Sequence, residues 1–512
     1  MSHDSNRDGS LSPRSKLVPL ALGPLLGLLV YFILPETYTN AAGNAATLSH
    51  AARACLAMVV WMGAWWFTEA VPLAVTALLP IVCFPLFGVS SAADALKNYA
   101  NSTIYLFLGG FLIAAGIARW GLDRRIALLT IRVVGTKPKQ IILGIMMATA
   151  FLSAWVSNTA TAAMMLPIAL ALMGVVRTTR ADLPIDNAER NFGVCLLLSI
   201  AYGASLGGIA TLIGTPPNGI FVRFVEQTYG DVVSFVGWFQ ISLPVVILLL
   251  AGTYFMLVNF LFRELPGELP GGREWVVGEL KAIGRLTRGE WTVLIVFVIA
   301  ALLWTFGPVI RPLKLFGTQP FKPMSDTVIA MGAGLSLFII PVDLKKGLHA
   351  LDWNSAAKGI AWDVLLLFGG GLTMASAIQK TGVADAVGAV CMALGSLPEW
   401  GIVGGVTTLA VFVSEFTSNT ALAATLMPLV SVVADSLKFN PESLLVCATI
   451  GASCAFMMPV GTPPNAMVFG TGRIRIQDMI RAGIWLNIMA VIVITGLCYL
   501  LLPMGLIPSV TG

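Results

Sequence analysis

The chain has 512 residues, of which 57% are hydrophobic and 11% are charged, and its mean hydropathy is +0.85. These values exclude a set of soluble domains and a disordered chain. The net charge of +5 does not indicate nucleic-acid binding, because the basic residues lie in short segments between long apolar runs. Those runs lack the alternation of a membrane barrel, so the composition predicts an all-α polytopic membrane protein.

Cysteine and histidine offer little for a catalytic or metal site. The seven cysteines lie in apolar stretches, without the close pairs of a disulfide framework or a metal centre, and the three histidines are far apart. We therefore expect no organic cofactor and no enzyme active site built on these residues.

Residues 1–53 comprise a polar, basic tail and a first apolar run over 17–34. A cleaved signal peptide is the alternative, but this run is longer than a usual signal core, which favours a retained first span. Residues 54–262 form a first unit. We expect it to contain spans at 54–67, 71–89 and 104–118, an apolar segment at 141–176 with a polar centre, a broken helix at 192–222 and a span at 236–262.

Residues 263–288 form a charged connector that we expect to be cytoplasmic, and residues 289–512 form a second unit of the same plan. We expect the second unit to contain spans at 291–310, 328–342 and 364–378, an apolar segment at 401–437 with a polar centre, a broken helix at 443–470 and a last span at 482–502.

Two motifs show that the second unit repeats the first. The first unit contains Ser157-Asn158-Thr159 and Gly214-Thr215-Pro216-Pro217-Asn218, and the second contains Ser418-Asn419-Thr420 and Gly461-Thr462-Pro463-Pro464-Asn465. Asn158 and Asn419 are 261 positions apart, and the glycine pair at 109–110 recurs 261 positions later at 370–371. Thr215 and Thr462 are 247 positions apart. The chain is therefore an internal duplication.

The distribution of Lys and Arg predicts the orientation. With the N-terminus inside, 23 of the 31 basic residues face the cytoplasm and 8 face outward. We therefore expect a multi-pass protein of the cell (inner) membrane, with a cytoplasmic N-terminus and an extracytoplasmic C-terminus. Both ends of 141–176 then lie inside and both ends of 401–437 lie outside. Such inverted repeats are typical of secondary transporters with a site near mid-membrane.

Each arm of these two segments is about 17 residues, or roughly 26 Å of helix, which fits either two short spans or a re-entrant hairpin. In re-entrant hairpins both Ser-Asn-Thr tips reach mid-membrane, where free helix amides and a threonine hydroxyl bind an anion. Each Pro-Pro pair removes backbone donors and leaves carbonyls around Gly214 and Gly461 without helical partners, which suits Na⁺.

Charge balance links the two kinds of site. No Lys or Arg occurs in 141–176, 192–222, 401–437 or 443–472. An anion buried there would lack a protein cation, and leaving its charge unpaired is very costly. Bound cations would balance that charge, so the sequence predicts coupling between the anion and the cations.

Plainer interpretations exist for several of these residues. Proline and glycine also mark simple kinks in membrane helices, and Ser153 and Ser414 would equally bond the carbonyl of the preceding turn. Glu415 and Asp435 are ionisable residues in apolar stretches, where a functional role is the first hypothesis. For Glu415 we favour a buried structural acceptor.

With these motifs, the Gly-Gly helix beginnings and the number of spans, nearly the whole chain resembles the divalent-anion:sodium symporter family of dicarboxylate and citrate carriers. The resemblance implies about 11 transmembrane helices plus two re-entrant hairpins, a homodimer built on scaffold helices, and an elevator-type movement. It implies a substrate site formed by Asn158, Thr159, Thr215, Pro216, Asn419, Thr420, Thr462 and Pro463. It also implies one sodium site at Ser153, Ser157, Asn158 and Gly214, and another at Ser414, Thr417, Asn419 and Gly461.

At positions 414, 417 and 461, where relatives carry Thr or Ala, this chain has Ser, Thr and Gly. Ser414 keeps a hydroxyl, and Thr417 and Gly461 can bind Na⁺ through their backbone carbonyls. We expect Na⁺-coupled symport of C4-dicarboxylates such as succinate, fumarate or malate, with the dicarboxylate and membrane lipid as partners. A sodium-independent dicarboxylate exchanger and a citrate or sulfate carrier are the alternatives. Inverted broken helices around one site disfavour a channel, and an intramembrane enzyme using Glu415 and Asp435 lacks a convergent base, nucleophile or metal set.

Overall fold

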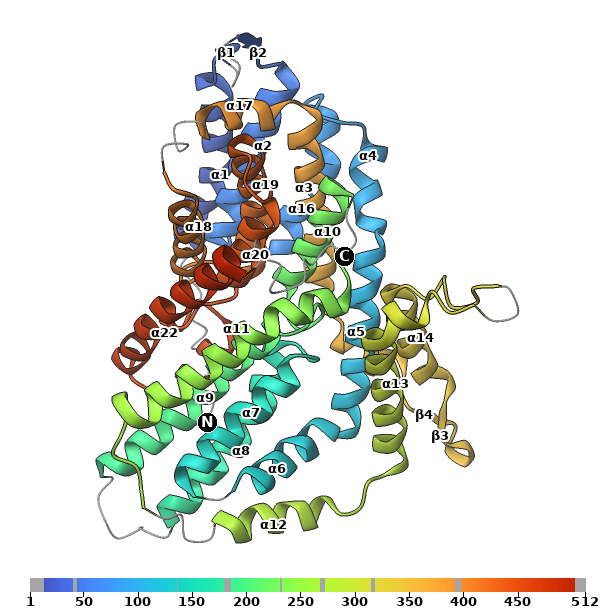
Figure 1. Ribbon diagram of the computed structural model, residues 1–512, viewed down its shortest axis with the longest axis vertical. Coiled ribbons are helices and arrows are strands. Elements are labelled where there is room, and N and C mark those ends of the chain that lie inside the picture. The colour runs from blue at the N-terminus through green and yellow to red at the C-terminus, as the bar shows by residue number, and fades with distance from the viewer. Residues whose placement is uncertain are drawn as a thin grey trace, which may run out of the picture.

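The computed structural model describes residues 13–39, 44–135, 137–178, 186–230, 233–267, 272–314, 318–391 and 397–501. Most of them lie in helices (Figure 1). Two ribbons of short antiparallel strands are added: β1 (Thr37–Thr39) pairs with β2 (Ala45–Thr47), and β3 (Pro341–Asp343) pairs with β4 (Leu348–His349). The part of the basic tail before Pro13 and the predicted extracytoplasmic C-terminus lie outside the described residues.

In the described residues, one helix lies in the N-terminal segment, ten belong to the first unit and one lies in the connector. They are α1 (Pro13–Ile33), α2 (His50–Thr68), α3 (Leu73–Leu86), α4 (Ala92–Lys97), α5 (Ser102–Trp120), α6 (Leu122–Val134), α7 (Pro138–Ser153), α8 (Asn158–Thr178), α9 (Asn187–Ile209), α10 (Pro216–Tyr229), α11 (Phe235–Phe255) and α12 (Gly272–Ile283). A 3₁₀ turn over Asn98–Ala100 precedes α5, and a π-helical turn over Met256–Leu261 extends α11.

The second unit follows the same order. Its helices are α13 (Arg288–Ile310), α14 (Asp326–Ile339), α15 (Trp353–Gly359), α16 (Trp362–Lys380), α17 (Val383–Cys391), α18 (Glu399–Val413), α19 (Asn419–Leu437), α20 (Pro441–Ala452), α21 (Pro463–Gly470) and α22 (Ile476–Gly496). A 3₁₀ turn at Leu344–Lys346 separates β3 from β4, and a π-helical turn at Leu497–Leu501 extends α22.

Local sequence explains where many of these helices begin and end. Asn101 caps α5 by accepting the N–H of Thr103 at 3.0 Å. Gly121 ends the same helix with a φ of +68°, a left-handed conformation that glycine adopts without steric cost. Thr287 and Glu290 form a capping box at the start of α13.

Nine helices of the described residues are long and apolar enough to cross a membrane. They include the second arms of both predicted hairpins, α8 and α19, while α1, α3, α14 and α20 are shorter apolar helices. The all-helical polytopic class is therefore confirmed. The count of about 11 spans plus two hairpins stays a prediction.

Corresponding helices of the two units exchange partners. The helix α5 packs on α14, and its counterpart α16 packs on α3, the counterpart of α14. Glycine permits both close approaches, because a Cβ on Gly109 would lie 2.4 Å from the carbonyl carbon of Ala330 and one on Gly370 would lie 2.4 Å from the carbonyl oxygen of Ala77. The units are thus interlocked rather than placed side by side.

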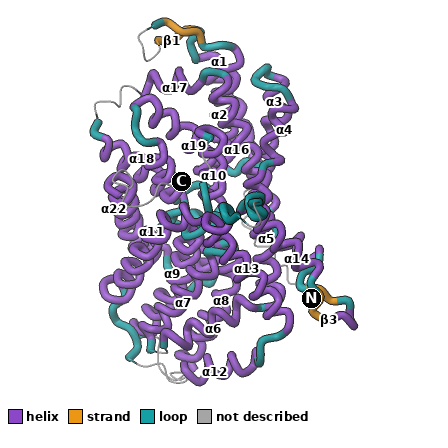
Figure 2. Tube along the Cα trace, turned by 45° about the vertical axis from the view of Figure 1, so that its right-hand side comes forward, coloured by secondary structure: helices purple, strands orange, loops and turns teal. Residues whose placement is uncertain are grey.

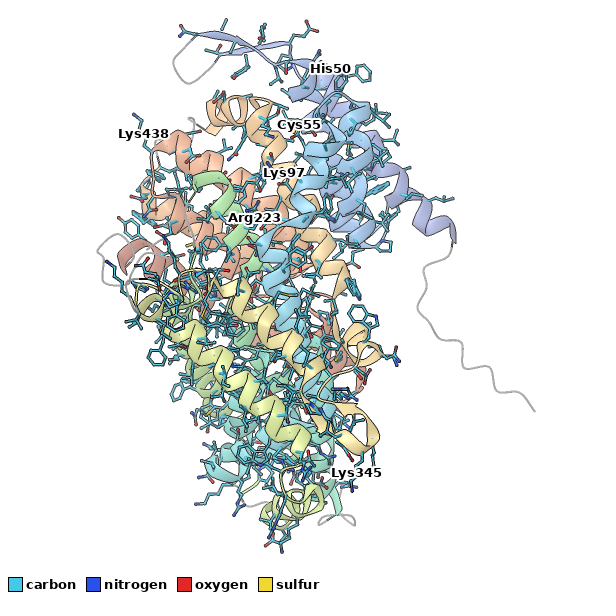
Figure 3. The ribbon with its side chains drawn as sticks, turned by 90° about the vertical axis from the view of Figure 1, so that its right-hand side faces the viewer. His50, Cys55, Lys97, Arg223, Lys345 and Lys438 are labelled. Carbon is cyan, nitrogen blue, oxygen red and sulfur yellow. The ribbon has the colours of Figure 1, made fainter. Side chains whose placement is uncertain are left out.

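The two hairpins occupy opposite halves of the molecule. The first, α7 and α8, lies toward the end marked by α6 and α12, and the second, α18 and α19, lies toward the end marked by α17 and β1 (Figures 1 and 2). Lys345 lies toward the first end, whereas Lys97 and Lys438 lie toward the other (Figure 3). This separation supports the predicted sidedness of these three lysines.

Two helices occupy segments that the sequence shows only as charged stretches. In α6 the residues Leu122, Leu128 and Ile131 are buried on one face, and the helix packs on α7 and α12. Arg125 of α6 is also buried, and its guanidinium forms two hydrogen bonds of 2.6 and 3.2 Å with the Glu290 carboxylate of α13. The connector is therefore folded onto the first hairpin.

Candidate functional site

The first Ser-Asn-Thr motif forms the turn between α7 and α8. Helix α7 ends at Ser153 and α8 begins at Asn158. The Oγ of Ser153 lies 2.8 Å from Asn158 Oδ1 and 2.7 Å from the carbonyl oxygen of Ala204 in α9. Ser157 Oγ accepts the N–H of Ala160 at 3.3 Å, as an N-cap does. The N–H groups of Asn158 and Thr159, which begin α8, have no carbonyl one turn earlier in the helix and can bind a ligand.

The Asn158 side chain lies directly against α9. A Cβ on Gly208 would lie 2.3 Å from Asn158 Oδ1, so a larger residue there would displace the Asn158 amide. A Cβ on Gly214 would lie 2.5 Å from the carbonyl oxygen of Gly208 and 3.1 Å from that of Ala154. Three of the residues predicted for the first sodium site, Ser153, Asn158 and Gly214, are thereby brought together around Gly208.

Asn218, the last residue of the first Thr-Pro-Pro-Asn motif, holds the break between α9 and α10. Its Nδ2 donates to the carbonyl oxygens of Gly208, Ile209 and Thr211, at 3.1, 3.4 and 2.7 Å. Its Oδ1 is buried and has no partner among the described residues. The sequence drew attention to this motif but did not reveal the Asn218 amide as the tie across the break.

The second break, between α20 and α21, is tied in the same way. Nδ2 of Asn465 donates to the carbonyl oxygens of Ala455 and Met458, at 3.1 and 3.0 Å. These acceptors lie 247 positions after Gly208 and Thr211. The duplication therefore preserves a three-dimensional contact as well as a motif.

Glu415 distinguishes the second half of the site from the first. Its buried carboxylate accepts the backbone N–H groups of Phe456, Met457 and Met458 at 2.7–3.0 Å, and Oε1 also accepts Asn487 Nδ2 of α22 at 2.7 Å. Our interpretation of Glu415 as a buried structural acceptor agrees with these contacts. The corresponding residue of the first unit is Ala154, whose carbonyl accepts the Thr211 hydroxyl.

Three of the residues predicted for the second sodium site, Ser414, Thr417 and Asn419, flank Glu415 in the chain. The hydroxyls of Ser414 and Thr417 donate to the carbonyls of the preceding turn, and their lone pairs stay available. Asn419 Oδ1 is buried without a partner among the described residues. A Cβ on Gly461 would lie 3.4 Å from Glu415 Oε2.

The residues predicted for the substrate line partly open surfaces. Thr159 and Pro463 are exposed, Asn158, Pro216, Asn419 and Thr420 are half-buried, and Thr215 and Thr462 are buried. Helix α10 lies against α19, and α21 lies against α8. Each broken helix thus contacts the hairpin of the other unit.

An aromatic cluster joins the first hairpin tip to helix α13. The Trp155 ring lies parallel to those of Phe235 and Trp304, with centroids 5.9 and 6.4 Å away, and meets the Phe297 ring edge to face at 4.9 Å. Trp304 and Phe297 belong to α13. The counterpart of Trp155 in the second unit, Phe416, is 65% exposed. The two tips are therefore docked differently.

The acids considered for an intramembrane enzyme do not share a site. Asp435 lies near the far end of α19 and accepts the Tyr229 hydroxyl at 3.2 Å. Glu415 precedes that helix, so the two carboxyls are separated by about 24 Å of helix rise. Among the residues that the structure describes, no three His, Cys, Asp or Glu side chains form a metal-binding group.

A family model described as the sodium:sulfate symporter transmembrane region matches residues 27–504. The chain belongs to this family. The resemblance seen in the motifs is thereby confirmed, and the sodium:sulfate symporter family is one of multi-pass membrane transporters, not of enzymes.

Relatives and solved structures match nearly the full chain. The sodium-dependent dicarboxylate transporter SdcS of Staphylococcus saprophyticus is 37% identical over 489 residues, 95% of this chain and 92% of that protein. SdcS of Staphylococcus aureus is 37% identical over 493 residues, 96% of this chain and 92% of that protein. The YdaH transporter of Alcanivorax borkumensis has a TM-score of 0.57 at 14% identity, covering 96% of this chain and 97% of that one. For MtrF of Neisseria gonorrhoeae the TM-score is 0.56 at 12% identity, and 95% of this chain and 96% of that one are covered. These two likenesses concern the fold alone.

Proposed function

We propose that this protein carries out Na⁺-coupled symport of C4-dicarboxylates such as succinate, fumarate or malate into the cell. The observation that carries the proposal is the pair of hairpin tips at Asn158 and Asn419, each next to a broken helix that an asparagine amide holds open. The 37% identity to sodium-dependent dicarboxylate transporters supports the same substrate class.

Electrostatics supports the coupling. The segments around the hairpin tips and the two breaks, 141–176, 192–222, 401–437 and 443–472, contain no Lys or Arg, and Glu415 adds a buried carboxylate next to the second break. A dicarboxylate at the tips would bring two more negative charges, which helix amides alone would not balance. Co-transported Na⁺ at the two predicted sodium sites supplies the missing positive charge. Sodium and dicarboxylate therefore bind together or not at all.

The movement we propose is alternating access of elevator type. The hairpins, broken helices, α11 and α22 would move together against a scaffold of α2, α3, α5, α13, α14 and α16. Two observations support a transporter that alternates between two related end states. Each broken helix contacts the hairpin of the other unit, and the two hairpin tips are docked differently. We further propose a homodimer built on scaffold helices, in the cell membrane, with a cytoplasmic N-terminus and an extracytoplasmic C-terminus.

Uptake by purified protein in proteoliposomes tests the function. Radiolabelled succinate uptake should rise severalfold with an inward Na⁺ gradient compared with a matched K⁺ gradient. Equal uptake in both would reject coupling. Acceleration by internal succinate without sodium would indicate the exchanger instead, and stronger competition by citrate or sulfate than by fumarate or malate would reject the C4 class.

The assigned tips are tested by Asn158→Ala and Asn419→Ala. Each asparagine is proposed to serve both the substrate and a sodium ion, so each variant should lose succinate uptake while eluting as folded protein in size-exclusion chromatography. Wild-type uptake by either variant would contradict the assignment of that tip.

A further inference from the structure

The two broken helices are built alike but are anchored with opposite polarity. In the first break, side chains of α11 donate to backbone carbonyls: Trp238 Nε1 to Ile209 at 2.9 Å and Ser242 Oγ to Ala210 at 2.8 Å. These two carbonyl oxygens are therefore engaged by protein donors.

In the second break, a carboxylate accepts backbone N–H groups instead. The residues matching Ile209 and Ala210 are Phe456 and Met457, and their amides donate to Glu415. Among the described residues, no donor reaches the carbonyl oxygens of Phe456 and Met457. The second break thus keeps carbonyl acceptors that the first break has used.

Peptide geometry explains what Glu415 does to these groups. In a trans peptide the C=O points opposite to the N–H, so convergence of the amides of 456–458 on Glu415 turns the carbonyls of 455–457 away from it. The carbonyl oxygen of Ala455 accepts a hydrogen bond from Asn465 Nδ2. The carbonyls of Phe456 and Met457 are left, and carbonyl oxygens are ligands that suit a hard cation.

Glu415 is itself too fully engaged to be a cation ligand. Its two oxygens accept hydrogen bonds from three backbone N–H groups and from the Asn487 side-chain amide, in five contacts of 2.7–3.0 Å. These contacts occupy the lone pairs of the carboxylate. Its Oε2 nevertheless lies only 3.4 Å from where a Cβ on Gly461 would be. Its charge therefore acts on the second predicted sodium site at short range.

We propose that Glu415 is a positioning residue for sodium. It fixes the 456–458 backbone and leaves the carbonyl oxygens of Phe456 and Met457 as ligands for the co-transported cation, and its charge makes the second sodium site bind Na⁺ more tightly than the first, where Ala154 takes its place. This inference rests on the proposed function, because it assigns a role within the same site.

Sodium titration of succinate uptake tests the proposal with Glu415→Gln, which keeps the side-chain shape. Loss of charge-assisted hydrogen bonds should raise the Na⁺ concentration for half-maximal uptake on the order of tenfold to a hundredfold. The KM for succinate and the maximal rate should approach wild-type values at saturating Na⁺. A purely structural role would lower the maximal rate at every Na⁺ concentration.

Asp435→Asn is the matched control, because it neutralises another acid of this hairpin far from the break and should leave the sodium titration unchanged. Asn487→Ala is a second variant that keeps the carboxylate and should raise half-saturating Na⁺ severalfold, so it decides the matter if Glu415→Gln does not fold. Unchanged half-saturation in either folded variant would overturn the inference. Sodium-independent uptake by the wild type would instead reject the proposed function.

Discussion

Replacing Gly208 with alanine tests how the first hairpin tip is held. The added Cβ would lie 2.3 Å from Asn158 Oδ1 and 3.1 Å from both Cγ and Nδ2 of the same residue. Relief of this overlap requires the side-chain amide to move by about 1 Å. The 2.8 Å contact between Ser153 Oγ and Asn158 Oδ1 would then break, at a cost of about 1 kcal/mol.

The effect on transport should exceed the effect on stability. A displacement of about 1 Å in a group that orients substrate costs on the order of a hundredfold in rate, whereas overpacking of one methyl costs about 1–3 kcal/mol of folding free energy. We therefore expect Gly208→Ala to lower Na⁺-driven succinate uptake on the order of a hundredfold. The variant should still elute as folded protein.

Gly174→Ala provides the matched control in the same hairpin. It lies in α8, and a Cβ there meets nothing within 4 Å, so uptake should stay at the wild-type level. The second unit shows that the restriction is local, because the residue corresponding to Gly208 is already Ala455. Normal uptake by Gly208→Ala, or an equal loss in Gly174→Ala, would refute the reasoning.

Three further predictions concern stability, measured by thermal unfolding in detergent. Asn218→Ala removes the ties to three carbonyls and should lower the unfolding free energy by about 2–4 kcal/mol and abolish uptake; a loss below 1 kcal/mol would contradict this. Burial raises the pKa of Asp123 in the non-spanning helix α6 to about 6, with the Arg124 N–H partly opposing the shift, so the folded state binds this proton more tightly than the unfolded state. Stability should therefore fall as pH rises from about 4 to 6, and Asp123→Asn should be more stable by about 1–3 kcal/mol at pH 7 but not at pH 4; a pH-independent difference would reject this cause. Arg125→Ala leaves the buried Glu290 carboxylate without its ion pair and should cost about 3–5 kcal/mol, and a double-mutant cycle with Glu290→Gln should show coupling; additive losses would exclude it.

The sequence alone determined the membrane class, the duplication and the family resemblance. Long apolar runs and helix breakers such as Pro216 and Pro463 act over a few residues, so their consequences can be derived without tertiary contacts. Helix α6 and the connector helix α12 were not predicted from the sequence, although the helical spacing of Leu128 and Ile131 is a local signal that could have indicated α6.

Only the tertiary structure decided how the breaks are held. Asn218 reaches carbonyls up to ten positions away, Glu415 reaches amides more than forty positions away, and Asn487 arrives from a helix still further along the chain. No periodicity or motif encodes such pairings, because a hydrogen bond depends on distance and direction in space rather than on separation in sequence. The repeat predicted two equal halves. The fold made them unequal, since an asparagine amide ties both breaks to carbonyls but only the second break is also held by a buried carboxylate.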